Sequence, residues 1–279
     1  SSTSSTRSFF RTDRLADAAQ GRAAPTFTSR DTVMLDSLHR PANVAVVGSS
    51  GGIGAALVRQ LTEDESVGTI YALSRSGQDA SPGNAIPRYI DIAKEESVRH
   101  AAEVAGESGP LDLVIVATGI LHQGAEIAPE KAMRELSPDA LASVFATNCI
   151  GPSIVAKHFL PLMRKGEKSV FAALSARVGS IADNRLGGWV SYRASKAALN
   201  MVLKTLSIEH ARRWPESVIV GLHPGTVDSA LSRPFNKRVE AGKLFTPERA
   251  ARQLLDVINV LAPADTGYTY AWDGKRIPF

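Results

Sequence analysis

From Asn43 onward, short apolar runs alternate with longer segments of helical spacing, and this alternation restricts the chain to few folds. The apolar runs lie at 43–48, 69–73, 88–90, 112–118, 169–175 and 217–223. The segments of helical spacing lie at 52–64, 95–107, 141–165, 196–214 and 247–262. Runs rich in Val and Ile without polar alternation are typical of strands buried on both faces, as in a parallel sheet. The repeated order of strand, helix and strand predicts a doubly wound α/β sheet.

The first 41 residues differ in composition from the rest of the chain. They are rich in Ser, Thr, Ala and Arg and poor in acidic residues, which resembles an organellar transit peptide. A flexible extension is the equal alternative. We therefore predict an N-terminal extension over 1–41 and a single domain over 42–279. A transit peptide would place the protein in a mitochondrion or chloroplast, and otherwise we expect a cytoplasmic location.

Composition excludes several classes of function. The net charge is +4, but no dense run of Lys and Arg lies beside aromatic residues, so we predict no nucleic-acid partner. No apolar run approaches the ~20 residues that a membrane span needs, so we predict a soluble protein without a membrane partner. The one cysteine, Cys149, has no partner for an internal disulfide. No group of His, Cys, Asp and Glu has metal-ligand spacing, so we predict no metal.

A glycine-rich turn lies between the first predicted strand and the first predicted helix. The stretch VAVVGSSGGIGAALV places Gly48, Gly52 and Gly54 there, with Ser50 and Ile53 in the same turn. Glycines allow a tight turn and let backbone N–H groups approach a phosphate at the helix N-terminus. The context is the one that a dinucleotide fingerprint requires, although the spacing is Gly-x-x-x-Gly-x-Gly. We therefore predict a Rossmann-type domain, with a mostly parallel sheet of about seven strands flanked by helices.

The ends of the second and third predicted strands bear on the choice of cofactor. The second strand ends in Ser74 and Arg75, without the carboxylate that would accept a ribose 2′-OH, and a cation there favours a 2′-phosphate. We therefore predict NADP(H), with NAD(H) as the alternative. After the third strand, Asp91 could accept from the adenine amino group or form the N-cap of the following helix. Ile92 lies beside it and is included in the predicted cofactor site.

Three motifs in the chain, GSSGGIG, ATNCIGP and YRASK, resemble those of the short-chain dehydrogenase/reductase family. The resemblance extends over about residues 42–279 and is nearest to a carbonyl-reductase-like subgroup, to which the stretch GILHQGAEIAPEK is also similar. It implies an oxidoreductase that transfers hydride between nicotinamide and a ketone, an aldehyde or a secondary alcohol. It also implies a small-molecule substrate and a homo-oligomer, either a dimer or a tetramer.

The resemblance further implies roles for particular residues. Tyr192 and Lys196 match the catalytic pair, and Asn148 matches an asparagine that holds a water between the lysine and solvent. The other matched positions belong to the cofactor site: Gly48, Gly52 and Gly54 at the pyrophosphate, Asp91 at adenine, Gly119 after the fourth strand, and Pro224, Gly225 and Thr226 near the nicotinamide carboxamide.

The spacing of Tyr192 and Lys196 has a chemical reason. Residues four apart lie on the same face of a helix. A free tyrosine has a pKa of about 10. A nearby ammonium favours the phenolate, so we expect Lys196 to lower the pKa of Tyr192 toward the working pH that acid–base catalysis needs.

The chain departs from the family pattern at two places. Ala117, Thr118 and Gly119 replace the usual Asn-Ala-Gly, and we expect a weaker tie between that loop and the central strands. The family's catalytic serine is expected three residues before Gly179, where this chain has Ala176.

Two serines remain candidates for that role. We favour Ser175 as the serine that assists Tyr192, with Ser180 as the alternative. These departures also leave open a second interpretation, a dinucleotide-binding regulatory or signalling protein with little turnover.

The long connection over 225–245 follows the sixth predicted strand. In the family this region closes over substrate. Phe235 and Leu244 could contact an apolar substrate, although Phe235 is as well interpreted as a core residue.

Overall fold

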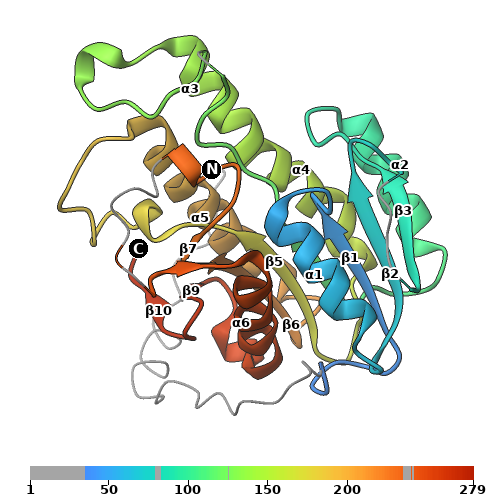
Figure 1. Ribbon diagram of the computed structural model, residues 1–279. Coiled ribbons are helices and arrows are strands. Elements are labelled where there is room, and N and C mark those ends of the chain that lie inside the picture. The colour runs from blue at the N-terminus through green and yellow to red at the C-terminus, as the bar shows by residue number, and fades with distance from the viewer. Residues whose placement is uncertain (1–34, 79–82, 125, 235–239, 241) are drawn as a thin grey trace, which may run out of the picture.

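The computed structural model describes residues 35–78, 83–124, 126–234, 240 and 242–279. Its centre is one sheet of eight strands in the order β10-β9-β6-β5-β4-β1-β2-β3 (Figure 1). The strands are β1 (Ala42–Val47), β2 (Val67–Ser74), β3 (Ala85–Tyr89), β4 (Leu113–Val116), β5 (Ser169–Leu174), β6 (Ser217–His223), β9 (Thr269–Ala271) and β10 (Arg276–Ile277). All neighbours pair in parallel except β9 and β10. The fold is therefore the predicted doubly wound α/β fold.

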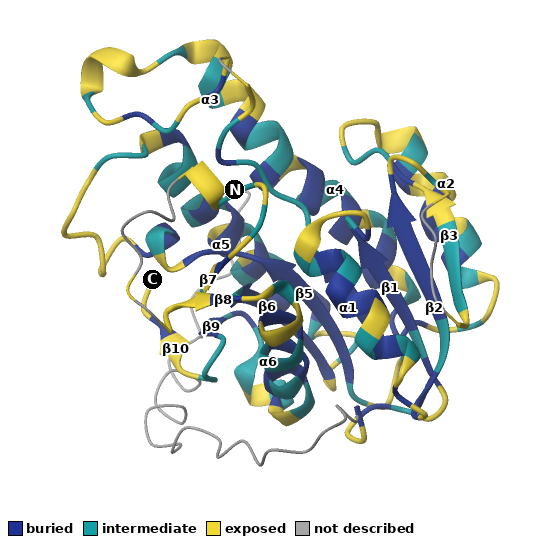
Figure 2. Ribbon diagram, in the orientation of Figure 1, coloured by how far each residue is buried: buried dark blue, intermediate teal, exposed yellow. Residues whose placement is uncertain are grey.

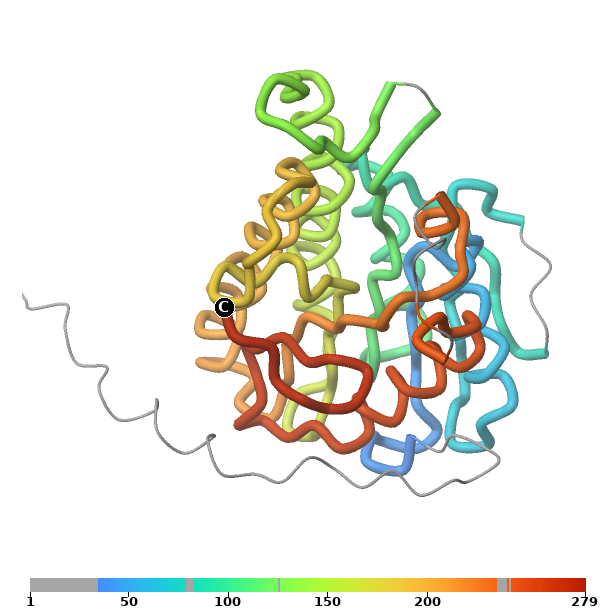
Figure 3. Tube along the Cα trace, turned by 60° about the vertical axis from the view of Figure 1, so that its left-hand side comes forward, coloured from blue at the N-terminus to red at the C-terminus, as the bar shows by residue number. Residues whose placement is uncertain are grey.

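Helices cover both faces of this sheet. They are α1 (Gly52–Thr62), α2 (Glu95–Gly106), α3 (Pro138–Phe145), α4 (Gly151–Phe159), α5 (Val190–His210) and α6 (Pro247–Val260). The helices α1 and α6 pack together against one face, and α2, α4 and α5 cover the other, where α4 and α5 run side by side (Figure 3). The central strands are buried on both faces, which is why their sequences lack polar alternation (Figure 2).

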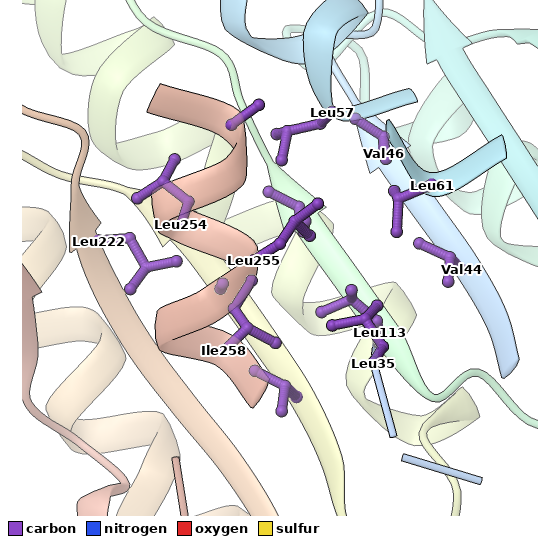
Figure 4. Close-up of a cluster of buried hydrophobic side chains, with 14 of the residues drawn as sticks. Leu35, Val44, Val46, Leu57, Leu61, Leu113, Leu222, Leu254, Leu255 and Ile258 are labelled. Carbon is purple, nitrogen blue, oxygen red and sulfur yellow. The ribbon is translucent and has the colours of Figure 1, made fainter. Parts of the chain in front are cut away.

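The core beneath α1 and α6 includes residues from the segment before β1. Leu57 of α1 and Leu254 of α6 meet the sheet residues Val46 and Leu222 in one apolar cluster, which also contains Leu35 (Figure 4). The Leu35 side chain is fully buried, and its N–H donates to the carboxylate of the buried Asp64 at 2.8 Å. Leu35 and Leu38, in the segment predicted as extension, therefore belong to this core, and residues 1–34 lie outside the described part.

The structure adds to the predicted elements at two places. The short strands β7 (Thr226–Val227) and β8 (Leu244–Phe245) pair with each other, and β9 and β10 extend the main sheet beyond β6. The predicted helix over 141–165 is divided, because a π-helical turn over Ala146–Ile150 separates α3 from α4. π-helical turns are rare and frequently mark functional sites.

One continuous helical stretch of the described chain, Pro138–Leu162, is long and apolar enough to cross a membrane by length and composition alone. It consists of α3, the π-helical turn, α4 and the short turn after it. Val155 and Phe159 of this stretch are fully buried in the core beneath α4 and α5. Core helices of globular proteins pass the same test, so it is weak evidence for a membrane span.

Candidate active site

The glycine-rich turn joins β1 to α1 at the carboxyl edge of the sheet. Gly48 has a φ of 91°, a conformation that favours glycine. At Gly54 a Cβ would lie 2.1 Å from the carbonyl oxygen of Gly48, so only glycine allows α1 to start this close to the strand. The strand order reverses between β1 and β4, where ligands of doubly wound sheets bind. The turn therefore lies where a dinucleotide is expected.

The polar groups of this turn fit a dinucleotide. The N-cap of α1 is Gly51, which offers no side-chain hydrogen bond, and Ser50 and Gly52 are exposed. The buried hydroxyls of Ser49 and Thr118 have no hydrogen-bond partner among the described residues. An uncapped helix N-terminus binds anions through its free N–H groups and its dipole. The turn can accordingly hold a pyrophosphate.

The end of β2 has the expected charge. Arg75 is exposed there, and the hydroxyl of the buried Ser74 lies 2.8 Å from the Ser76 hydroxyl and accepts from the Gly77 N–H. Ser74 thus holds the turn, while the Arg75 guanidinium is left at the surface.

Asp91 follows β3, and its carboxylate does not cap α2. It accepts from the Ala93 N–H at 3.1 Å, whereas the N-cap of α2 is Lys94. The predicted alternative of a helix N-cap is therefore wrong, because the helix begins at Glu95, four residues after Asp91. Ile92 packs against the start of α4, since a Cβ at Gly151 would lie 2.7 Å from its Cδ1.

Tyr192 and Lys196 lie in the first turns of α5, so the helix begins earlier than the predicted residue 196. Lys196 is buried, and its Nζ donates to the Leu174 carbonyl at 2.7 Å, at the end of β5. The same Nζ lies 5.9 Å from the centroid of the Tyr192 ring and 3.6 Å from where a Cβ on Gly119 would be. The structure thus brings together the tyrosine, the lysine and the loop after β4.

The two side chains have shifted ionisation. Burial raises the pKa of the half-buried Tyr192 to about 12, and burial lowers the pKa of Lys196 to about 8. The expected lowering of the tyrosine pKa is not seen in this structure, because desolvation disfavours the phenolate. Burial therefore favours the protonated form of the Tyr192 hydroxyl.

Asn148 lies in the π-helical turn and is fully buried, so it does not face solvent. Its Oδ1 accepts from the Ile120 N–H and its Nδ2 donates to the Ile120 carbonyl, both at 2.8 Å. The Nδ2 also donates to Ser195, whose hydroxyl donates to the Tyr192 carbonyl. Asn148 therefore connects the loop after β4 to α5 and supplies the tie that we expected to be weak without the usual Asn-Ala-Gly.

The serines near the end of β5 are engaged in other bonds. The Ser175 hydroxyl donates to Asn200 Oδ1 at 2.7 Å, and Thr269 donates to the same oxygen. The Ser180 hydroxyl accepts from the Asp183 N–H at 3.1 Å. No hydrogen bond of either hydroxyl to Tyr192 is present in the described part of the chain. Ala176 stands at the family's serine position.

The turn after β6 packs against Phe245 of β8. Gly225 has a φ of 80°, and a Cβ there would lie 2.6 Å from the Phe245 ring. Pro224 and Gly225 are partly buried and Thr226 is exposed. Ile53 packs against the small cluster that contains Phe245. Of the predicted substrate contacts, Leu244 is partly exposed in β8, and Phe235 lies outside the described residues.

Sequence reasoning missed three residues around α5. Glu130 is buried and accepts from the Ser191 N–H at 3.2 Å and from the Ser191 hydroxyl. Trp189 has a φ of 52°, and its ring meets the Tyr192 ring edge-on at 6.5 Å. Ser195 is fully buried between Asn148 and Tyr192. Only Glu130 left a signal, because it belongs to the GILHQGAEIAPEK stretch that the resemblance singled out.

The described residues do not bring together the donor groups that a metal ion needs. Among the described residues, no group of three or more His, Cys, Asp and Glu side chains could hold a metal ion.

The fold and these residues define a Rossmann-type α/β protein with a tyrosine–lysine pair at the carboxyl edge of its sheet. The family model for short chain dehydrogenase matches residues 42–240. The chain therefore belongs to the short-chain dehydrogenase/reductase family and is an oxidoreductase of that family.

Relatives share most of their length with this chain. An uncharacterized oxidoreductase of Schizosaccharomyces pombe is 30% identical over 253 residues, covering 84% of this chain and 96% of the relative. The 1-hydroxy-2-glutathionyl-2-methyl-3-butene dehydrogenase of a Rhodococcus strain is 32% identical over 233 residues, covering 83% and 96%. The solved structure of NADPH-bound carbonyl reductase from chicken fatty liver has a TM-score of 0.74 at 24% identity, covering 87% and 96%. The fold is thus carbonyl-reductase-like.

Proposed function

We propose that the protein is an NADP(H)-dependent reductase of ketones or aldehydes, with Tyr192 as the proton donor. One observation supports it above the others: the buried Lys196 ammonium lies 5.9 Å from the Tyr192 ring, at the carboxyl edge beside the glycine-rich turn. The Rhodococcus relative and the chicken enzyme, a dehydrogenase and a carbonyl reductase by name, support the same class of chemistry.

The cofactor would be held along the carboxyl edge of the sheet. The turn containing Gly48, Gly52 and Gly54 would hold the pyrophosphate, and Arg75 would pair with the 2′-phosphate. Asp91 would accept from adenine, and the other cofactor residues are Ser50, Ile53, Ser74, Ile92, Gly119, Pro224, Gly225 and Thr226. When bound, the reduced nicotinamide supplies a hydride to the carbonyl carbon.

The residues of α5 handle the proton. With a pKa raised to about 12, the Tyr192 hydroxyl is protonated at neutral pH and can donate to the carbonyl oxygen. Below its pKa of about 8, Lys196 carries a positive charge that favours the phenolate left behind. Asn148 holds the loop after β4 against this helix through Ile120 and Ser195.

Steady-state kinetics test this proposal. NADPH and NADH oxidation should be followed by absorbance against a panel of aromatic and aliphatic ketones and aldehydes. We expect turnover with NADPH and a fall of about 100-fold or more in kcat for Tyr192→Phe, since general acid catalysis contributes about 10²–10⁴-fold. Tight NADPH binding without oxidation on any substrate would contradict the proposal and favour a dinucleotide-binding regulatory protein.

Ser175 remains our choice for the serine that assists Tyr192. Its place at the end of β5, directly after the Leu174 carbonyl that Lys196 contacts, supports it. For this role its hydroxyl must leave Asn200 when substrate binds. The kinetics of Ser175→Ala and Ser180→Ala decide between the two serines, because only the assisting hydroxyl should lower kcat by about tenfold or more when removed.

The assembly and the location of the protein stay predictions. A dimer or tetramer is expected from the family, and light scattering of the purified chain measures it. Fusion of residues 1–41 to a fluorescent protein tests whether this segment directs import into an organelle.

A further inference from the structure

The segment between β4 and α3 contains a buried carboxylate that the proposed chemistry leaves without a role. Glu130 is 3% exposed, and among the described residues its carboxylate is hydrogen-bonded to Ser191. A buried carboxylate is costly unless its oxygens are hydrogen-bonded. Its bonding partners should therefore identify its role.

The partners of Glu130 all lie at the start of α5. Its Oε2 accepts from the Ser191 N–H at 3.2 Å and its Oε1 accepts from the Ser191 hydroxyl. Its backbone carbonyl accepts from the Trp189 N–H at 2.6 Å. The side-chain carboxylate and the backbone carbonyl of Glu130 thus both bond to the chain within three residues of Tyr192.

The N-cap residue of α5 makes no side-chain capping bond of its own, although Arg193 in the first turn donates to the carbonyls of Gly187 and Gly188. Helices usually begin with an extended Ser, Thr, Asp or Asn whose side chain accepts a backbone N–H. Here the N-cap is Trp189 in the left-handed region, with a φ of 52° and no side-chain cap. Gly187 and Gly188 before it also have positive φ. Glu130 supplies the missing cap from 61 residues earlier in the chain, at the end of the helix dipole that favours an anion.

We propose that Glu130 is a positioning residue for Tyr192, acting through Ser191 and the backbone of Trp189. This inference rests on the proposed function, since it assumes that Tyr192 donates the proton. Tyr192 directly follows Ser191 in the first turn of α5, so the bonds to Ser191 fix the backbone position from which the Tyr192 side chain projects. Proton transfer depends on hydrogen-bond reach, and small displacements of a positioned group reduce rates strongly.

The proposal predicts a separation of turnover from cofactor binding. Glu130 contacts α5, whereas the glycine-rich turn joins β1 to α1. We therefore expect Glu130→Ala to lower kcat for carbonyl reduction by about 10- to 100-fold. The NADPH Kd, measured by fluorescence, should change less than twofold. Glu130→Gln keeps one accepting oxygen and should recover part of the lost kcat.

Matched variants separate this role from general damage. Glu126→Ala removes an exposed carboxylate from the same segment and should keep kcat within twofold of the parent. Ser191→Ala should lower kcat, and Glu130→Ala combined with Ser191→Ala should lower it by less than the product of the two single effects. Thermal unfolding shows whether each variant is folded, and Glu130→Gln replaces Glu130→Ala in the comparison if the latter is not.

The outcomes distinguish the inference from the proposed function. If Tyr192→Phe retains full activity, the proposed function fails. If Tyr192→Phe is inactive while Glu130→Ala and Glu130→Gln keep kcat within twofold, the positioning role alone is overturned. The same holds if NADPH Kd weakens in parallel with kcat, or if the Glu130 and Ser191 effects multiply independently.

Discussion

The helices α1 and α5 both begin at the carboxyl edge of the sheet, but their N-termini differ in capping: that of α1 has no side-chain cap, and that of α5 is capped by a distant residue. The start of α1 has glycine at its cap and no side-chain hydrogen bond. The start of α5 is held by Glu130, a carboxylate from a distant segment. A helix N-terminus attracts anions in both cases. At α1 no side chain of the described residues caps this end, so a ligand can approach it, whereas at α5 the Glu130 carboxylate is the anion and fixes the residue before Tyr192.

The largest effect is expected from a substitution that displaces the N-terminus of α1. In Gly54→Ala the new Cβ would lie 2.1 Å from the Gly48 carbonyl oxygen and 3.1 Å from the Ser49 Cα, both backbone atoms. The start of α1 must then shift away from the strand. If the N–H groups of this turn bind the phosphate as proposed, they move with the helix, and we expect NADPH affinity to fall by about 100-fold or more.

Calorimetric titration with NADPH measures this loss. Gly106→Ala is the control, because its Cβ would meet Leu162 at 3.4 Å, close to ordinary contact, in α2 away from the edge. Unchanged affinity in Gly54→Ala would show that α1 is not the phosphate-binding end.

Tyr192 and Lys196, in the first turns of α5, should determine how the rate of reduction depends on pH. Tyr192, with a pKa of about 12, stays protonated from pH 6 to 9, so it does not limit the rate there. Lys196 has a pKa of about 8, so its charge is present below that pH and is lost above it. We expect kcat to be level below about pH 7 and to fall roughly tenfold between pH 7 and pH 9.

Lys196→Met removes the titrating group. In this variant the fall near pH 8 should disappear and kcat should be low throughout. A rate that rises through pH 8 in the parent protein would show that a deprotonated lysine is the active form.

A substitution at Arg75 tests whether the cofactor that we propose to bind at the start of α1 carries a 2′-phosphate. Because the guanidinium is exposed, its pairing with a 2′-phosphate is partly screened by solvent. We expect Arg75→Ala to lower the ratio of kcat/KM for NADPH over NADH by about fivefold, or about 1 kcal/mol.

Arg88→Ala provides the matched change on the neighbouring strand β3, where the residue is also exposed. It should leave the ratio unchanged. A parent protein that prefers NADH would remove the role given to Arg75.

The difference between the starts of α1 and α5 also explains which features could be predicted from the sequence. The geometry of Gly48 and Gly54 follows from neighbouring residues, so the glycine pattern predicted that turn and the strand before it. Tyr192 and Lys196 were found because the YRASK motif resembles that of the family, and four residues of helix then place the two side chains on one face. The start of α5 was missed, since it depends on Glu130, which only the folded chain brings to Ser191.

Other misses have the same physical origin. The π-helical turn and the bonds of Asn148 to Ile120 depend on packing between segments 28 residues apart. The strands β7 to β10 have two or three residues each, too few for a hydrophobic period to appear. Leu35 was assigned to the extension because its partner Asp64 lies beyond α1.

The smallest effect tests whether the start of α5 is really held in its unusual conformation. Asparagine tolerates the left-handed region, whereas a β-branched residue is a genuine outlier there. Both Trp189→Asn and Trp189→Val lose the edge contact with Tyr192. If the Glu130 carbonyl keeps the backbone of residue 189 left-handed, the Val variant should unfold with about 1 kcal/mol less free energy than the Asn variant, despite being more apolar. Urea denaturation of the two variants measures the difference, and equal free energies of unfolding would mean that the N-terminus of α5 relaxes freely, as that of α1 can.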